Sequence, residues 1–171
     1  MCEVRRIGRV LQVLKSNGET VYYDDMPYLD FFEGFLAVAK KGRWTFIDEE
    51  GDEICLPQYE DADYFSEGLA AVKMSSGWGF INTSGVEICP LRYSATGNFI
   101  NGYARVKRDE KWLFINTQGK EICEPLFEDV CDFEKDGKAY VRSASQWGWL
   151  NQNGEVSWQG SLETELTLKV N

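Results

Sequence analysis

The sequence contains no histidine among its 171 residues. Histidine is the usual general base in nucleophilic catalysis and a frequent metal ligand, so its absence removes the simplest arrangements for both. The glycines fall at expected turns and form no phosphate-binding loop. Carboxylates are too plentiful to be specific, because pairs such as Asp61 with Asp63 meet a glycosidase's spacing of roughly 5–10 Å by chance. We therefore expect no enzymatic activity and no cofactor.

Cysteines are few, odd in number and never spaced as CxxC. Three of the five, Cys55, Cys89 and Cys123, lie 34 residues apart. One thiol per period, without a signal peptide, is typical of reduced cysteines packed as small apolar residues. We expect neither a metal site nor a disulfide framework.

Long apolar runs and an excess of basic residues are also missing. No segment reaches the roughly 20 apolar residues of a membrane span, and the N-terminus lacks the apolar core and cleavage site of a signal peptide. With 28 acidic and 18 basic residues the net charge is −10. This charge disfavours nucleic acids and anionic membranes as partners, so we expect a cytoplasmic protein that binds neither directly.

What the sequence does contain is a fixed period. Four tryptophans lie 34, 34 and 35 residues apart, each followed by apolar residues and a turn. The four copies are GRWTFIDEEG (42–51), SGWGFINTSG (76–85), EKWLFINTQG (110–119) and QWGWLNQNG (146–154). A period of this length is the mark of a repeat architecture, which builds binding surfaces more often than active sites.

Each repeat is predicted to form three short antiparallel strands, LAAVK, WGFI and VEIC in the copy at residues 65–93. The loop Asn82–Gly85 predicts a type I turn with a G1 bulge, because Asn bonds the backbone two residues on and Gly takes a positive φ. A proline ends the third strand in three copies, at Pro57, Pro90 and Pro125. The fold class is therefore all-β.

Aromatic residues recur at fixed positions of the repeat, which indicates a core shared between neighbouring repeats. We expect this core to contain Tyr59, Tyr93, Phe127, Phe65, Phe99, Phe133 and the repeated tryptophans Trp44, Trp78, Trp112 and Trp147. A row of ligand-stacking side chains is the alternative for the tryptophans.

The chain is predicted to be one repeat domain over residues 1–171. Its parts are an N-terminal half-repeat (13–27), four repeats (28–58, 59–92, 93–126 and 127–158) and a C-terminal cap strand (159–171). Half-repeats at both termini fit either a stacked array or a closed, propeller-like ring.

The units G-L-A-x-V-K, W-G-F-I-N-x-x-G, E-I-x-P and Y-x-D-A resemble the WG repeat, or KWG repeat, common in bacterial proteins, over roughly residues 28–158. Thr45 and Leu113 replace the glycine that follows Trp78 and Trp147, so we expect a looser backbone approach in those two copies. The resemblance implies a β-rich repeat protein used for interaction, and it implies no catalytic residue.

Acidic residues gather in two stretches without Lys or Arg, Asp48–Val72 and Glu121–Glu134. Basic residues gather instead before the tryptophans, at Lys40, Lys41, Arg43, Lys107, Arg108 and Lys111. Aligned repeats would place an acidic band on one rim and a weaker basic band on the other. The predicted acidic face comprises Glu60, Asp61, Asp63, Glu67, Glu128, Asp129, Asp132 and Glu134. A solvated surface that only keeps the protein soluble is the alternative.

Positions that break the repeat are further candidates for partner binding. Arg105 and Tyr140 replace Ala71, Trp149 replaces Phe80, and Trp158 has no counterpart in the other copies. Tyr, Trp and Arg are the usual anchors of interfaces. Packing under the C-terminal cap is the alternative for Trp158.

These observations predict a non-catalytic protein-binding module. Its most concrete form is a cytoplasmic immunity protein, an antitoxin whose acidic face binds and blocks a basic toxin domain. The alternative is a glycan-binding or small-molecule-binding repeat protein that uses aromatic residues between its repeats.

Overall fold

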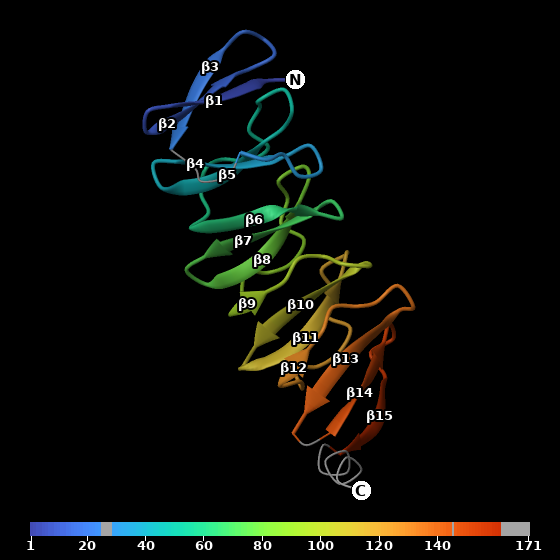
Figure 1. Ribbon diagram of the computed structural model, residues 1–171. Coiled ribbons are helices and arrows are strands. Elements are labelled where there is room, and N and C mark those ends of the chain that lie inside the picture. The colour runs from blue at the N-terminus through green and yellow to red at the C-terminus, as the bar shows by residue number, and fades with distance from the viewer. Residues whose placement is uncertain (25–28, 145, 162–171) are drawn as a thin grey trace, which may run out of the picture. The chain divides into compact units, whose positions relative to one another are not determined.

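The computed structural model describes residues 1–24, 29–144 and 146–161, and these residues form strands, bridges and turns without a helix (Figure 1). The predicted all-β repeat fold is confirmed. The chain forms two compact units, an N-terminal unit of residues 1–91 and a C-terminal unit of residues 92–171. Their boundary lies next to the predicted border between the repeats 59–92 and 93–126.

The N-terminal unit contains three antiparallel sheets, with strand orders β1-β2-β3, β4-β5 and β6-β7-β8. Their strands are β1 (Glu3–Ile7), β2 (Val10–Leu14), β3 (Thr20–Asp24), β4 (Leu36–Lys40), β5 (Arg43–Ile47), β6 (Asp61–Ser66), β7 (Leu69–Met74) and β8 (Gly77–Asn82). The first sheet begins at Glu3, ahead of the half-repeat predicted at 13–27.

The C-terminal unit contains two antiparallel sheets, with strand orders β11-β10-β9 and β12-β13-β14-β15. Their strands are β9 (Ala95–Thr96), β10 (Tyr103–Arg108), β11 (Lys111–Asn116), β12 (Asp129–Val130), β13 (Lys138–Ser143), β14 (Gln146–Asn151) and β15 (Val156–Ser161). Of the cap strand predicted at 159–171, residues 162–171 lie outside the described residues.

The predicted third strand after the turn forms in the N-terminal half-repeat as β3 and in the last copy as β15, but not in the three copies that carry E-I-C. Each E-I-C segment makes only a single bridge, such as Ile81 with Glu87, because the proline that follows lacks a backbone donor. In these sheets an additional strand comes from the segment that precedes the central hairpin in the chain. Thus β6 pairs with β7, and β12 pairs with β13. These segments were predicted only to supply core aromatic residues.

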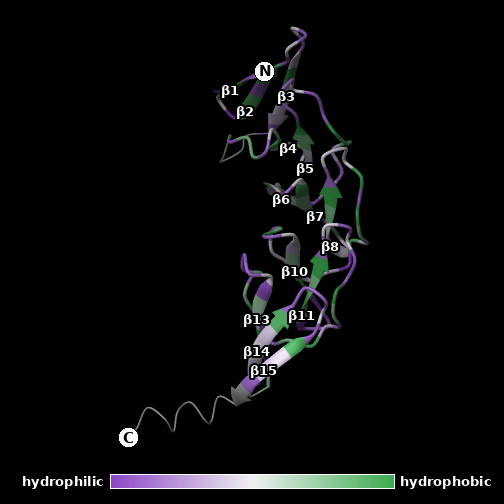
Figure 2. Cartoon of the chain, turned by 90° about the vertical axis from the view of Figure 1, so that its right-hand side faces the viewer, coloured by the Kyte–Doolittle hydropathy of each residue, from purple (hydrophilic) through white to green (hydrophobic). Residues whose placement is uncertain are grey.

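Within each unit, the ring of a phenylalanine packs between two consecutive sheets. In the N-terminal unit, the Phe65 ring lies 4.6 Å from Phe35 and 4.9 Å from Phe46, centroid to centroid. Phe46 and Phe65 belong to one buried cluster with Ala70 and Val72 of the following sheet. The two faces of a sheet are thus buried against different neighbours, and much of β8 and β11 is hydrophobic (Figure 2).

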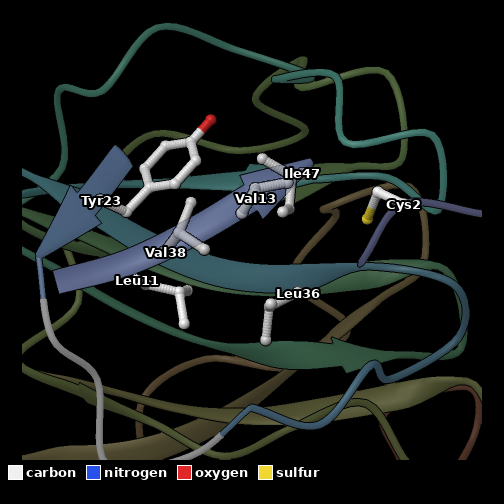
Figure 3. Close-up of a cluster of buried hydrophobic side chains, with 7 residues drawn as sticks. All are labelled: Cys2, Leu11, Val13, Tyr23, Leu36, Val38 and Ile47. Carbon is white, nitrogen blue, oxygen red and sulfur yellow. The ribbon is translucent and has the colours of Figure 1, made fainter. Parts of the chain in front are cut away.

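The C-terminal unit repeats this contact with different residues. The Phe133 ring is stacked 4.2 Å from Tyr103 and meets Phe114 edge-on at 5.0 Å. At the start of the chain, aliphatic residues take this role between the first two sheets (Figure 3). That cluster comprises Cys2, Leu11, Val13, Tyr23, Leu36, Val38 and Ile47.

The predicted core is confirmed for the recurring Phe and Tyr residues, and the repeated tryptophans lie at its edge, where Trp44 and Trp112 pack against the buried clusters. The six Phe and Tyr side chains are at most 2% exposed, whereas Trp44, Trp78, Trp112 and Trp147 are only half-buried. Each tryptophan stands near the hairpin end of its strand, where its cross-strand partner is often a cation. Lys73 Nζ lies 5.6 Å from the ring centre of Trp78, an arrangement that stabilises an indole at the edge of a core.

The glycine of the Trp-Gly pair has a steric reason. A Cβ atom at Gly79 would overlap the side chain of Leu91 and lie 3.2 Å from the Pro90 carbonyl oxygen. The first copy carries Thr45 at the equivalent position, and its hydroxyl donates a hydrogen bond of 2.7 Å to the Cys55 carbonyl. The looser backbone approach expected in this copy stays a prediction.

All five cysteines are free thiols, and only Cys131 is exposed. Cys2 and Cys89 are buried, and burial raises the pKa of the Cys123 thiol, which favours its neutral form. The expectation of reduced cysteines packed as apolar residues agrees with these positions.

Gly85 allows a direct test of the predicted turn, which requires a residue with positive φ at this position. It has a φ of 74° and follows Asn82, whose Oδ1 accepts from the N–H groups of Ser84 and Val86 at 3.0 Å. A Cβ atom at Gly85 would overlap the carbonyl oxygen of Ile54. We expect Gly85→Ala to lower the free energy of unfolding by about 2–4 kcal/mol in denaturant titrations.

Gly68→Ala is the matched control, because Gly68 has a φ of 76° with open space around its Cβ direction. That substitution carries only backbone strain, about 1 kcal/mol. Equal losses in the two variants would contradict the close contact between the turn and Ile54.

Candidate functional site

Four of the predicted acidic residues line β6, an edge strand of its sheet. Glu60 precedes the strand, Asp61 and Asp63 lie on it, Glu67 follows it, and all four are exposed. Asp61 accepts from the N–H of the next residue at 3.0 Å, and Asp63 does the same at 2.8 Å. These bonds fix the two carboxylates on the strand while leaving them accessible to solvent.

The turn after β6 is held by a carboxylate that sequence reasoning did not single out. Glu33 accepts from the N–H of Glu67 at 2.8 Å and from that of Gly68 at 2.7 Å. Glu67 itself has a φ of 54°, so the two bonds support a left-handed backbone. The acidic edge is therefore a fixed feature of the fold.

The other four acidic residues surround β12, the equivalent edge strand of the last sheet. Glu128, Asp129 and Glu134 are exposed and Asp132 is half-buried. Glu128 lies 3.3 Å from Lys111 Nζ and 3.0 Å from an Arg142 nitrogen. The hydrogen bond from Lys111 holds the pKa of Glu128 below its usual range.

The structure brings the acidic residues together within each group. The two groups, around β6 and β12, belong to different compact units. A single face formed by all eight residues stays a prediction.

The basic residues do not form a separate rim as predicted. Arg43 lies 3.5 Å from Glu60, and Lys111 lies 3.3 Å from Glu128. A bridge between Trp44 and Tyr59, and its counterpart between Trp112 and Phe127, sets each cation beside the acidic edge. The pairs neutralise part of the acidic charge, so the carboxylates of Asp61 and Asp63 dominate the field at β6.

An exposed aromatic pair at this edge was missed from the sequence. Tyr64 follows Asp63 on β6, is 43% exposed, and stacks on Phe32 with ring centroids 4.5 Å apart. Phe32 is 41% exposed. The available signal was the repeat itself, because Asn98 and Asp132 stand at the positions equivalent to Tyr64.

The predicted non-repeat anchors lie in the C-terminal unit. Arg105 Nε is 3.3 Å from Asp132, so two predicted partner-binding residues pair with each other. Tyr140 stacks on Trp147 at 5.9 Å and meets Trp149 edge-on at 6.1 Å. These three rings form an aromatic cluster on the last sheet.

Trp158 is 42% exposed and does have a counterpart in the repeat. The pairing of Leu150 with Val156 matches that of Ile115 with Glu121, which places Trp158 at the position of Cys123. Val156, Ser157 and Trp158 stand where the other copies have Glu, Ile and Cys, and this loss of the E-I-C motif concealed the register in the sequence.

A buried hydrogen bond between Tyr and Glu recurs along the chain. The hydroxyl of Tyr93 donates to Glu121 at 2.9 Å, and that of Tyr23 donates to Glu53 at 2.9 Å. Burial raises the pKa of Tyr23 and that of Tyr59, the latter to about 12. The raised pKa keeps the Tyr23 hydroxyl protonated at neutral pH, so it remains a donor to Glu53.

Glu121 also accepts from Arg92 and Arg108. Burial alone would raise the pKa of Glu121, but the hydrogen bonds from Tyr93 and Arg108 lower it overall. Elsewhere in the described part of the chain, no group of three or more Cys, Asp or Glu side chains is arranged to hold a metal ion. Nor do the described residues include a helix that could cross a bilayer.

The phenyl rings packed between the sheets do not offer a surface for glycan binding. These rings, Phe46, Phe65, Phe114 and Phe133, are at most 2% exposed. The alternative of glycan binding through more exposed aromatic residues between repeats stays a prediction.

The chain matches the family model described as "WG containing repeat" over residues 44–76, 78–112 and 114–143, more than half of its length. It belongs to this family, as the Trp-Gly motif indicated. A comparison with curated proteins returns no significant match.

Among solved structures, the chain is similar to Hsv2 of Kluyveromyces lactis, at 12% identity and a TM-score of 0.52. A form of KlHsv2 with loop 6CD replaced by a Gly-Ser linker aligns at 11% identity and the same TM-score. The matches cover 91% of this chain and 58% and 60% of those proteins, so the chain spans about three fifths of their length. These neighbours are β-propeller-like, which identifies the fold alone.

We expect the Glu121 network to make stability depend on pH. The pKa of Glu121 is lowered in the folded protein. The stabilisation that its carboxylate provides is therefore fully present above the ordinary carboxyl pKa of about 4.3, and it is lost as the pH falls through the folded pKa. Glu121→Gln should lower the free energy of unfolding at pH 7 by about 1–2 kcal/mol, the value of charge-assisted bonds partly screened by solvent.

Thermal unfolding of both proteins at pH 7 and at pH about 3 checks this, with the difference expected to shrink at the lower pH. Glu110→Gln is the control, because that side chain is 85% exposed. A deficit of the same size at both pH values would mean that the charge of Glu121 plays no part.

Proposed function

We propose that this chain is a non-catalytic protein-binding module, most concretely a cytoplasmic immunity protein that binds and blocks a basic toxin domain. Membership of a repeat family with β-propeller-like structural neighbours supports the binding role. The proposal includes neither a nucleic acid nor a membrane as a partner.

The observation that carries the proposal is the exposed Phe32–Tyr64 pair at the acidic edge strand β6. Exposed aromatic rings that are already stacked lose little side-chain entropy on binding, which is why Tyr is a frequent interface anchor. Asp61 and Asp63 on the same strand supply the charge that would select a basic surface. The aromatic pair would provide apolar contact area, and the two carboxylates would favour a positively charged partner.

Charge also predicts how the complex would form. A net charge of −10 steers a basic protein toward the chain from a distance, and added salt screens that steering. Substitutions of exposed charges should therefore alter the association rate, whereas loss of an aromatic anchor should mainly raise the dissociation rate.

The test begins with capture of partners from source cells on the immobilised chain at low and high salt. A captured basic protein is then purified, assayed for growth inhibition with and without this chain, and used for binding kinetics. We expect D61N/D63N to slow association by about three- to tenfold at low salt, and Tyr64→Ala to weaken affinity by about tenfold or more.

Asp109→Asn combined with Glu110→Gln is the matched control, because it removes the same charge from the β10–β11 hairpin. The proposal fails if this control slows association as much as D61N/D63N. It also fails if the captured protein inhibits growth equally with and without the chain.

A further inference from the structure

The last sheet differs from the others on its outer face, which carries Lys138, Tyr140, Trp149 and Ser157. The register pairs Trp149 with Tyr140 on one side and with Ser157 on the other, so the indole lies in the middle of a row across β13, β14 and β15. In the preceding sheets the equivalent face packs against the next repeat. The outer face of the last sheet can therefore be compared, position by position, with faces that are packed in the earlier repeats.

The changes replace packing residues with polar ones. Lys138 stands where Phe35 and Tyr103 contact a phenylalanine of the following repeat. Ser157 stands where Ile54 and Ile122 pack against the core clusters. Both substitutions remove apolar contacts that a further repeat would need.

The same face gains aromatic area at its centre. Trp149 replaces the phenylalanine found as Phe46 and Phe114, and Tyr140 stands where the first repeat has Ala37. These two substitutions add aromatic ring area to the face, whereas Lys138 and Ser157 remove apolar side chains from its borders.

The outward face of the first sheet offers a comparison. It carries Glu3, Arg5 and Gln12, at positions equivalent to Leu36, Val38 and Thr45, together with the exposed side chains of Leu14 and Tyr22. The last sheet differs because three of its aromatic rings contact one another, those of Tyr140, Trp147 and Trp149.

A pocket of about 300 Å³ lies beside Trp149. In the earlier repeats, the corresponding place over Phe46 or Phe114 is filled by a phenyl ring, that of Phe65 or Phe133. In the last sheet the pocket is lined by Lys138, Trp149, Asn151, Glu155, Val156, Ser157 and Gln159. Its volume is at the lower end of the range for small-molecule sites, roughly 300–1,000 Å³.

The polar lining is held in place by its own hydrogen bonds. Asn151 donates to Glu155 at 2.9 Å, and Gln159 donates to Ser157 at 3.1 Å. The amide of Gln159, the hydroxyl of Ser157, the carboxylate of Glu155 and the ammonium of Lys138 thus surround one indole. The pocket beside Trp149 is therefore bordered by both hydrogen-bond donors and hydrogen-bond acceptors.

The charge of the lining selects among ligands. Lys138 and Glu155 balance each other, so the pocket has no excess of cations to favour a phosphate. An aromatic side chain would fill the space but would leave the polar rim desolvated without partners. A ring with apolar C–H faces and hydroxyl groups at its edge can stack on the indole and also form hydrogen bonds with the polar side chains of the lining.

We propose that this pocket binds a pyranose ring of a neutral glycan, stacked on Trp149 and hydrogen-bonded to Glu155, Ser157 and Gln159. The site lies on the last sheet and involves neither β6 nor the Phe32–Tyr64 pair. It is therefore independent of the proposed binding of a basic protein.

The test uses the full chain and a panel of methyl pyranosides of glucose, galactose, mannose and N-acetylglucosamine with their β-linked disaccharides. Tryptophan fluorescence titration and saturation-transfer NMR report binding. We expect a saturable change with at least one sugar, at concentrations up to about 10 mM, the range of weak single-ring binding. The Tyr side-chain mimic p-cresol is titrated in parallel.

Trp149→Phe is the decisive variant, because phenylalanine is the residue that the other repeats carry there and the fold should tolerate it. It should weaken sugar binding at least tenfold, and Gln159→Ala should weaken it several-fold. Trp78→Phe, the same substitution at a half-buried site of the other unit, should leave the affinity unchanged.

Three outcomes overturn the proposal: no saturable signal with any sugar, equal affinities for the wild-type protein and Trp149→Phe, or tighter binding of p-cresol than of every sugar. The last result would identify an aromatic side chain as the natural occupant. None of these outcomes bears on the acidic edge, which is tested with its own variants.

Discussion

The contact on which the structure depends is the insertion of one phenyl ring between consecutive sheets. Phe65 and Phe133 each touch an aromatic pair on the preceding sheet while belonging to the repeat that follows. A small sheet with two apolar faces is not stable alone in water, so each repeat gains its stability from its neighbours. This dependence explains why the ring recurs while other positions of the repeat vary.

Polar contacts reinforce the same arrangement and set its register. The Tyr–Glu hydrogen bond recurs between repeats, and in the last copy its two positions become Phe127 and Val156, which share an apolar cluster. Replacing both partners together avoids a buried donor or acceptor without a partner. The fold thus accommodates either a Tyr–Glu hydrogen bond or an apolar Phe–Val contact at these two positions, provided that both residues differ together.

Both proposed binding sites lie where the repeat is broken, because most residues that keep the period are committed to packing. Tyr64 interrupts the pattern on an edge strand and stays exposed beside two carboxylates. Trp149 and Lys138 interrupt it on the last sheet and line a pocket. The two places differ in chemistry, one acidic with an apolar anchor and the other neutral with a polar rim. A repeat array can carry such different surfaces because no single surface is needed for folding.

The sequence by itself determined the period, the all-β class, the Asn–Gly turns and the buried Phe and Tyr positions, because these follow from local propensity and from repetition. Only the tertiary structure decided that the repeated tryptophans are half-buried, that Arg43 lies beside Glu60, and that Phe32 stacks on Tyr64. The physical reason is that burial, ion pairing and pocket formation depend on which segments of the chain pack against each other. These contacts join residues far apart in the sequence, and neither the spacing of the repeats nor their composition specifies them.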